Sequence, residues 1–190
     1  LADAFRHMIE YVGGIAHAAD RLAAGDLEAR VAPRSEQDVL SRYVLAAAAA
    51  NAGIVVRLTA DCPLHSPDTV DEVIQAFLDS GADYASNTNP YTRPDGQDVE
   101  VFTRAMLDRA AAAAEAGPDR EHVTPWIRRS PDAVRLDVRH RPPHFPSLRW
   151  SVDHPDDLEF ARTVWSCLDR RGTGPFTFEE IMSAVIESGA

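Results

Sequence analysis

The sequence contains no lysine, because all 19 of its basic residues are arginine. No lysine side chain is available to form a Schiff base or to bind phosphate, so arginine or a metal ion must hold any phosphate that binds. Its two cysteines, Cys62 and Cys167, are too few for a disulfide framework or a zinc site and favour a reducing cytoplasmic location. We find no apolar run of membrane-spanning length and no signal-peptide pattern, so we expect no membrane partner.

Positive charge is also scarce, since the formal net charge at pH 7 is -11. Nucleic-acid backbones are bound by basic patches, so we expect no nucleic-acid partner. A divalent cation can still mediate the binding of a nucleotide to an acidic protein. With 190 residues, 45% of them hydrophobic, the chain is long enough to form one soluble domain over residues 1–190.

Helical and extended patterns alternate along the chain. Helical patterns are expected over residues 1–25, 35–53, 66–81, 103–117, 119–130, 154–172 and 177–189. Extended patterns are expected over residues 27–32, 54–60, 82–87, 97–103, 133–139 and 148–152. This alternation predicts an α/β three-layer sandwich with helices on both faces of a mostly parallel sheet. Nucleotide-binding folds of this class usually open on a strand, so residues 1–25 are an atypical helical segment and the first strand is expected to be missing.

Three helix starts carry local signals. Ser66 is expected to cap a helix that has Pro67 at its first position and Gly81 at its end. Ser35 is expected to cap the helix that ends at Gly53, and Thr177 and Glu180 match a capping box. The helix after Ser66 presents one apolar face at helical spacing, made of Val70, Val73, Ile74, Phe77 and Leu78.

Two carboxylates follow extended segments directly. Asp61 comes after the apolar run that begins at Ile54, and Asp153 comes after the short segment 148–152. Ligands of open α/β sheets lie beyond the carboxyl ends of the strands, and two carboxylates there can share one Mg²⁺. On spacing alone, the alternative is that both acids cap the helices that follow them and favour the helix dipoles.

Five segments occur in an order that resembles the cytidylyltransferase-like family that includes spore-coat polysaccharide biosynthesis proteins. They are RSEQDVLSRY, VVRLTADCPLHSPDTVDEVI, ADYASNTNPYTRPDGQDVEVF, REHVTPWI and LRWSVDHPDDLEF. The resemblance runs from about Arg30 to the C-terminus, and that family is similar to the acylneuraminate and KDO cytidylyltransferases. It implies a nucleotide-diphospho-sugar transferase-like fold and a sugar nucleotidyltransferase. Such an enzyme joins CTP, or another NTP, to a sugar or sugar phosphate with release of pyrophosphate.

The resemblance also implies roles for single residues. In these relatives the metal-binding acids sit in segments that match Asp61 and Asp153 here, with Mg²⁺ as cofactor. The segment that holds Ser35, Glu36 and Asp38 is the one that contacts the base or ribose of the nucleotide. A capped helix start with acids near the dipole is the alternative for these three.

Other candidates come from the residues themselves. Arg57, inside an apolar strand, either pairs with an acid of the site or reaches a nucleotide phosphate. Asp98 and Glu100 are two apart on a strand, so they share one face and are candidates for substrate binding, whereas Val99 and Val101 supply the buried face.

Three further polar residues are candidates for sugar contact. Asn87 follows a strand, where it either binds the sugar or caps a turn. Glu121 is a candidate for sugar contact, and His122 for deprotonation of the attacking hydroxyl, with a structural role as its alternative.

The chain departs from the family at one place. The family opens with a strand and a loop of the form QARMGSTRLPGK that cradles the triphosphate, and no such loop occurs here. We therefore expect either a truncated catalytic domain or a non-catalytic sugar-binding or dimerising module. A glycosyltransferase of related topology is a further alternative, but the D-x-D pattern typical of those enzymes fails at Asp61. Relatives are commonly dimers, so a homodimer is a further expectation.

Overall fold

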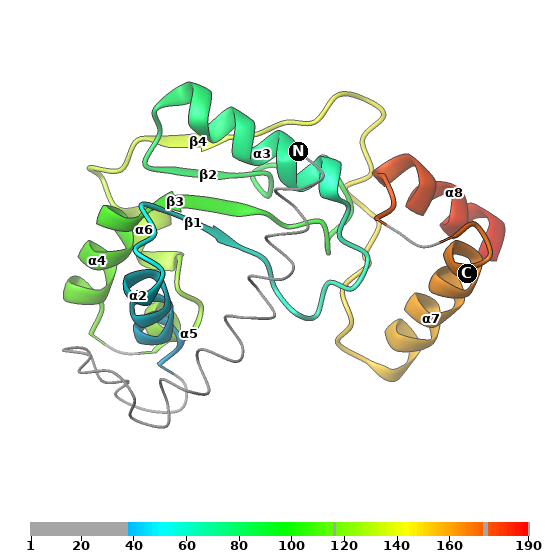
Figure 1. The fold of residues 1–190 in the computed structure, drawn as a ribbon, viewed down its shortest axis with the longest axis horizontal. Helices are drawn as coiled ribbons and strands as arrows, with labels where there is room; N and C mark the ends of the chain where they lie inside the picture. The colour runs from blue at the N-terminus through cyan, green and yellow to red at the C-terminus, as the bar shows by residue number, and fades with distance from the viewer. Residues whose placement is uncertain (1–37, 116, 173–174, 190) are drawn as a thin grey trace. The chain divides into compact units, whose positions relative to one another are not determined.

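The computed structural model describes residues 38–115, 117–172 and 175–189 (Figure 1). Its helices are α2 (Val39–Ala49), α3 (Pro67–Ser80), α4 (Arg104–Ala113), α5 (Pro118–Glu121), α6 (Pro125–Arg129), α7 (Pro155–Asp169) and α8 (Phe178–Ser188). Its strands are β1 (Ile54–Arg57), β2 (Tyr84–Ser86), β3 (Glu100–Thr103) and β4 (Arg135–Asp137). The elements expected over residues 1–25 and 27–32 lie outside the described ranges. No helix within those ranges has the length and apolar character needed to cross a membrane.

The strands form one sheet in the order β1-β3-β2-β4. The end of β3 pairs with the starts of both its neighbours: the Arg104 N–H donates to the Gly53 carbonyl (2.9 Å) and the Thr103 N–H to the Asp83 carbonyl (3.0 Å). Strand β3 is therefore antiparallel to β1 and β2. The predicted mixed α/β fold class is confirmed, and β3 is the strand that makes the sheet mixed rather than parallel.

The strand predicted over residues 148–152 is wrong for the described chain. This segment is extended, but its backbone bonds go to a loop: the Trp150 N–H donates to the Asp95 carbonyl (2.6 Å), and the Asp95 N–H donates to the Leu148 carbonyl (3.0 Å). These two hydrogen bonds form a single parallel bridge between Asp95 and Arg149. The segment fails to become a strand because its partner, the turn around Gly96, is too short to form a ladder.

The local helix signals are mostly confirmed. Helix α3 follows Ser66, has Pro67 in its first turn and ends at Gly81, which adopts the left-handed conformation that glycine favours (φ 65°). The capping box of Thr177 and Glu180 is present at the start of α8.

Two details of these predictions are wrong. Helix α2 is capped by Asp38, because the Asp38 carboxylate accepts the Ser41 N–H (3.2 Å), whereas Ser35 lies outside the described residues. The helix ends at Ala49, with Ala50 as its C-cap, before Gly53. Leu78 is 54% exposed, so the buried face of α3 does not include every residue of the apolar face predicted from the sequence.

The described chain divides into two compact units. Of the described residues, the first comprises 38–55, 82–84, 102–115 and 117–135, and the second comprises 56–81, 85–101, 136–172 and 175–189. Helix α2 packs on α4 and α5 in the first unit, and α7 packs on α8 in the second. Each unit has an apolar cluster of its own, built around Leu40, Phe102 and Leu107 in the first and around Trp150, Leu168 and Phe178 in the second.

A buried ion pair lies inside the first unit. The Arg120 guanidinium donates to both carboxylate oxygens of Asp38 (3.0 and 3.1 Å) and to the Ser41 hydroxyl (2.7 Å). It also donates to the carbonyls of Ala111 and Ala114 at the end of α4 (3.1 and 2.9 Å). Arg120 thereby joins the start of α2 to the end of α4 with neither charge left unpaired.

We predict that Arg120→Met lowers the free energy of unfolding by about 3–5 kcal/mol, because it leaves the Asp38 carboxylate buried and unpaired. Chemical denaturation monitored by circular dichroism measures the change. The matched control is Arg129→Met, which removes the exposed pair with Asp119 and is expected to change the stability far less, because solvent screens an exposed ion pair. Equal losses in the two variants would contradict the structural role of the buried pair.

A close backbone approach fixes the conformation of the loop before β3. Gly96 has a φ of 103°, and a Cβ atom at this position would lie 2.8 Å from the backbone of Trp150 and 2.8 Å from that of Ser151. Real Cβ atoms essentially never come so near to backbone atoms. Glycine is thus required here both by the dihedral angle and by the space.

We predict that Gly96→Ala lowers the free energy of unfolding by about 2 kcal/mol or more, from the strained φ and the overpacked contact together. Thermal and chemical denaturation measure this. Gly53→Ala serves as the control, since nothing lies within 4 Å of a Cβ built there. A Gly96→Ala protein as stable as the control would show that the two segments separate readily.

Candidate functional site

The first acid, Asp61, lies in the turn that follows β1. The Cys62 N–H donates to the Thr59 carbonyl (3.3 Å) and closes this turn. The Thr59 hydroxyl, hydrogen-bonded to the Asp61 carboxylate, lowers the pKa of Asp61 below its ordinary value, and burial only partly opposes the shift. Asp61 therefore stays ionised and exposed at the end of the strand, as a cation ligand must.

A backbone hydrogen bond joins the segments that carry the two acids. The Val152 N–H donates to the Asp61 carbonyl (2.8 Å). Asp153 is the next residue after this contact. The Asp153 carboxylate is itself bound by the Arg149 guanidinium (2.7 Å). The structure thus brings together the segments of the two predicted metal ligands, although they are far apart in the sequence.

Arg149 also organises the start of α7. Its guanidinium binds Asp157, whose carboxylate in turn accepts the backbone N–H groups of Asp153 (3.0 Å) and His154 (2.8 Å). Chiefly because of Arg149, the pKa of Asp157 falls to about 2. Asp157 rather than Asp153 therefore caps this helix, which leaves Asp153 as the acid that projects beyond it.

The two acids before and within β3 have different surroundings. Glu100 is 5% exposed and forms an ion pair with Arg57 (2.6 Å), which is the internal pairing that the sequence left open for Arg57. Asp98 accepts the Tyr91 hydroxyl (3.0 Å), and burial raises the pKa of its carboxyl above the ordinary value. Val99 and Val101 are fully buried, as expected. Glu100 is buried as well, so the opposite face of this strand is not simply exposed to solvent.

The carboxylates of Asp61 and Asp98 both act on the thiol of Cys62. Burial, together with the negative charges of Asp61 and Asp98, raises the pKa of the Cys62 thiol to about 12. Both carboxylates therefore lie near one buried thiol. A thiol with this pKa stays protonated at neutral pH, so Cys62 is no nucleophile.

Asn87 is held entirely by protein groups. Its side-chain amide donates to the Gln97 carbonyl (2.7 Å) and to His140 Nε2 (3.2 Å), and its oxygen accepts the Val99 N–H (2.9 Å). His140 in turn bonds through Nδ1 to Glu72 (2.5 Å). Asn87 is also only 3% exposed, so in this conformation it orders the start of β3 rather than presenting its amide to a ligand.

Sequence reasoning overlooked His65 as well as His140. Neither ring nitrogen of His65 has a hydrogen-bond partner in the described part of the chain. Burial lowers the pKa of His65 to about 4, so its ring is neutral near pH 7. A single histidine between Leu64 and Ser66 carries no sequence signal, because its burial depends on contacts made far along the chain.

The remaining candidates lie in the first unit or outside the described ranges. Asp38 is taken up by the buried pair with Arg120, whereas Glu121 and His122 are exposed at the end of α5. Ser35 and Glu36 lie outside the described residues. The second unit thus brings together six predicted site residues: Arg57, Asp61, Asn87, Asp98, Glu100 and Asp153.

Metal-binding capacity in the described ranges is limited to small sets of carboxylates. No group of three or more histidine, cysteine, aspartate or glutamate side chains there is arranged to hold an ion. An ion at Asp61 and Asp153 therefore needs further ligands from water or substrate, which is the usual situation for Mg²⁺.

Comparison with known proteins found relatives of similar sequence. The chain is 31% identical over 138 residues to the spore coat polysaccharide biosynthesis protein SpsF of Bacillus subtilis (strain 168), an overlap of 72% of this chain and 57% of the relative. It is 32% identical over 127 residues to the uncharacterized protein MJ1063 of Methanocaldococcus jannaschii, covering 66% of this chain and 51% of the relative. The chain thus spans little more than half the length of these two relatives.

A solved structure shares the fold. A cytidylyltransferase from Leptospira borgpetersenii serovar Hardjo-bovis (strain JB197) superimposes with a TM-score of 0.73 over 82% of this chain and 65% of that one, at 23% sequence identity. The family model described as "Cytidylyltransferase" matches residues 17–164, which is more than half of the chain. The chain belongs to the cytidylyltransferase family.

Proposed function

We propose that the protein is a sugar nucleotidyltransferase that uses Mg²⁺ at Asp61 and Asp153 and releases pyrophosphate from CTP or another NTP. The product is a nucleotide-activated sugar for cell-surface or spore-coat polysaccharide. Membership of the cytidylyltransferase family and similarity to SpsF support the reaction class. The observation that carries the site is the 2.8 Å hydrogen bond from the Val152 N–H to the Asp61 carbonyl.

The residues present fit a magnesium ion. Mg²⁺ prefers oxygen ligands and is commonly bound by one or two carboxylates, several waters and substrate phosphates. Asp61 is kept ionised by Thr59, and Asp153 lies just before α7 with one carboxylate oxygen bound by Arg149. When bound, Mg²⁺ would neutralise phosphate charge and align the attacking and leaving oxygens.

The proposed step requires little covalent chemistry from the protein. An oxygen of the sugar or sugar phosphate attacks the α-phosphorus, and the bond from that phosphorus to the bridging oxygen breaks. Pyrophosphate leaves with the electron pair of that bond, and a hydroxyl nucleophile gives its proton to a general base. His122 stays a prediction for that base, and the role of the protein is to position the reactants and to stabilise charge.

The alternative is a non-catalytic module that binds sugar or dimerises. Calorimetric titration of the 190-residue chain with CTP, with and without Mg²⁺, separates the two possibilities. Binding that requires Mg²⁺ supports the catalytic proposal. A folded chain that does not bind CTP would favour the non-catalytic module.

We predict that Asp61→Asn and Asp153→Asn each lower the rate of pyrophosphate release by about 100-fold or more, because each removes one charged oxygen ligand. A coupled pyrophosphate assay with CTP, Mg²⁺ and a panel of sugars and sugar phosphates measures the rate. Asp156→Asn, in the first turn of α7, is the matched control with an expected rate near that of the unchanged protein. Activity of either site variant at the control level would refute the metal assignment.

We predict that Thr59→Val raises the pKa of Asp61 toward its ordinary value, because it removes the hydrogen bond that favours the carboxylate. The carboxylate would then take up its proton at higher pH, and Mg²⁺ binding would fail at higher pH. Titration of the Asp61 side-chain carbon by ¹³C NMR measures the shift. Thr163→Val, in α7, is the control, and an unmoved Asp61 midpoint would show that Thr59 does not set the charge of this site.

A further inference from the structure

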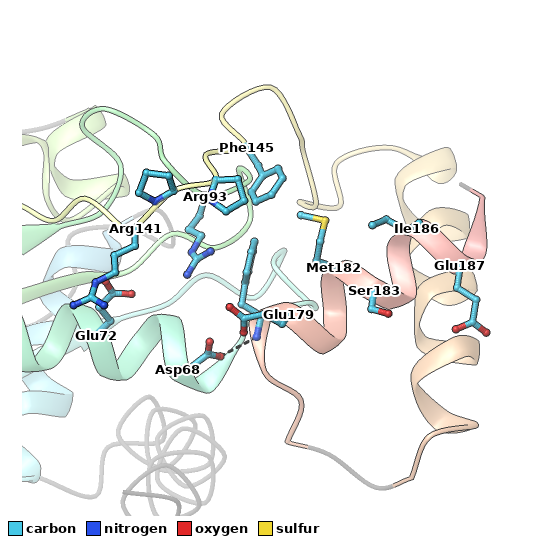
Figure 2. A pocket seen from close by; sticks show the side chains of 13 residues that line it. Asp68, Glu72, Arg93, Arg141, Phe145, Glu179, Met182, Ser183, Ile186 and Glu187 are labelled. Atoms are coloured by element: carbon cyan, nitrogen blue, oxygen red, sulfur yellow. Dashed lines mark hydrogen bonds between the residues drawn. The ribbon is translucent and has the colours of Figure 1, made fainter.

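A cavity of about 900 Å³ lies within the second unit, apart from the acids that follow β1. Figure 2 shows Arg93 and Arg141 on one side of it and Met182, Ser183 and Ile186 of α8 on another. None of the residues assigned above to nucleotide, metal or sugar lines this cavity. Its lining therefore requires an explanation of its own.

Two guanidinium groups in the lining have no hydrogen-bonding or anionic partner within the described ranges. Among the described residues, no hydrogen bond or ion pair is made by Arg93 or Arg141, and the Nε atom of Arg93 is buried without an acceptor. The Arg93 guanidinium lies 3.8 Å from the centre of the Phe178 ring. That ring covers one face of the planar cation and leaves the N–H groups at its edge free to donate.

Most acids of the lining are already engaged. Asp68 accepts the Phe178 N–H (3.0 Å), as Figure 2 shows, and Glu72 is bonded to His140 (2.5 Å). Glu187 is paired with Arg170 (3.0 Å) and Arg171 (2.6 Å). A partly buried guanidinium without a counter-ion is unfavourable. A ligand with an anionic group would supply the missing counter-ion in this cavity.

The other lining residues indicate the character of the rest of the ligand, beyond its anionic group. Phe145, Met182 and Ile186 give the cavity an apolar side, and Phe178 is stacked on Trp150 with 5.6 Å between ring centres. Glu179 is exposed at the rim and makes no hydrogen bond to a described residue. The carboxylates around the rim disfavour a polyanion such as a triphosphate, whereas one anionic group on an apolar body suits both sides.

We propose that this cavity is a binding site for a small molecule that carries a single carboxylate or phosphate monoester on a partly apolar body. Arg93 and Arg141 bind the anionic group, and Phe145, Met182 and Ile186 contact the apolar part. The inference does not rest on the proposed function, since it uses neither Asp61 nor Asp153.

The test is a titration with phenyl phosphate, and separately with benzoate, observed through ¹³C-labelled methionine methyl groups. The sequence has three methionines. The Met182 methyl, assigned with Met182→Leu, is expected to shift under the ring current of the ligand, whereas the Met106 methyl, buried in the core of the other unit, is expected to stay. The relative affinity of the two probes distinguishes a phosphate site from a carboxylate site, and phenol is the neutral control.

Arg93→Gln and Arg141→Gln are each expected to raise the Kd for the preferred probe about tenfold or more, because each removes a charge-assisted hydrogen bond. Arg162→Gln, an exposed arginine of α7 outside the cavity, is the matched control and is expected to leave the Kd unchanged. If Arg93→Gln fails to fold, the exposed Arg141→Gln variant decides. No Met182 shift at millimolar probe, equal binding of phenol, or unchanged affinity in Arg141→Gln would overturn the proposal.

Discussion

The extended segment from residue 148 to residue 152 is hydrogen-bonded along its backbone at two points, and the candidate site depends on this. The Trp150 N–H donates to the Asp95 carbonyl, and the Val152 N–H donates to the Asp61 carbonyl. Because side chains alternate along an extended chain, the burial of Trp150 and the projection of Arg149 and Asp153 are consequences of one register. A shift of one residue would bury the acid and expose the tryptophan, so the aromatic core of the second unit also fixes the position of Asp153.

Arginine compensates the acids in a chain that has no lysine. Arg57 binds Glu100, Arg149 binds Asp153 and Asp157, and Arg120 binds Asp38. A guanidinium remains charged on burial and can bind two carboxylate oxygens at once, which an ammonium group cannot do in the same fixed plane. Asp61 and Asp98 form no ion pair with an arginine among the described residues. The Thr59 hydroxyl lowers the pKa of Asp61, so Asp61 retains its charge, whereas burial raises the pKa of Asp98 and makes it a weaker acid. Two acids close to one thiol thus differ in how readily each gives up its proton.

The sequence predicted what depends on neighbours within a few residues, and it failed where distant partners decide. The helix starts at Ser66 and Thr177 and the two acids after extended segments could be predicted, because their signals lie within one helical turn or one strand. The cap hydrogen bond expected from Ser66 is not made, because its hydroxyl bonds to Thr69 and Gln97 instead. The absence of a strand at 148–152 could not be predicted, since it depends on whether Asp95 belongs to a ladder or to a turn. The use of Asn87 was equally hidden, because its amide is occupied by His140, which follows a different strand. Residue types in a motif indicate which groups meet, but not which of them remain free.

His140 couples the cavity to the start of β3 through its tautomer. The Asn87 amide nitrogen is a donor, so His140 Nε2 must accept from it, and Nδ1 must carry the proton that is donated to Glu72. Burial lowers the pKa of His140, which favours the neutral ring, and its Nδ1–H donates to Glu72 beside the cavity. The same Asn87 fixes the Val99 N–H and thereby the residues on either side of it, Asp98 and Glu100. A ligand anion near Glu72 would favour protonation of His140, which would turn Nε2 into a donor and remove the acceptor on which Asn87 depends. The order of β3 and the charge in the cavity are therefore linked through one imidazole ring.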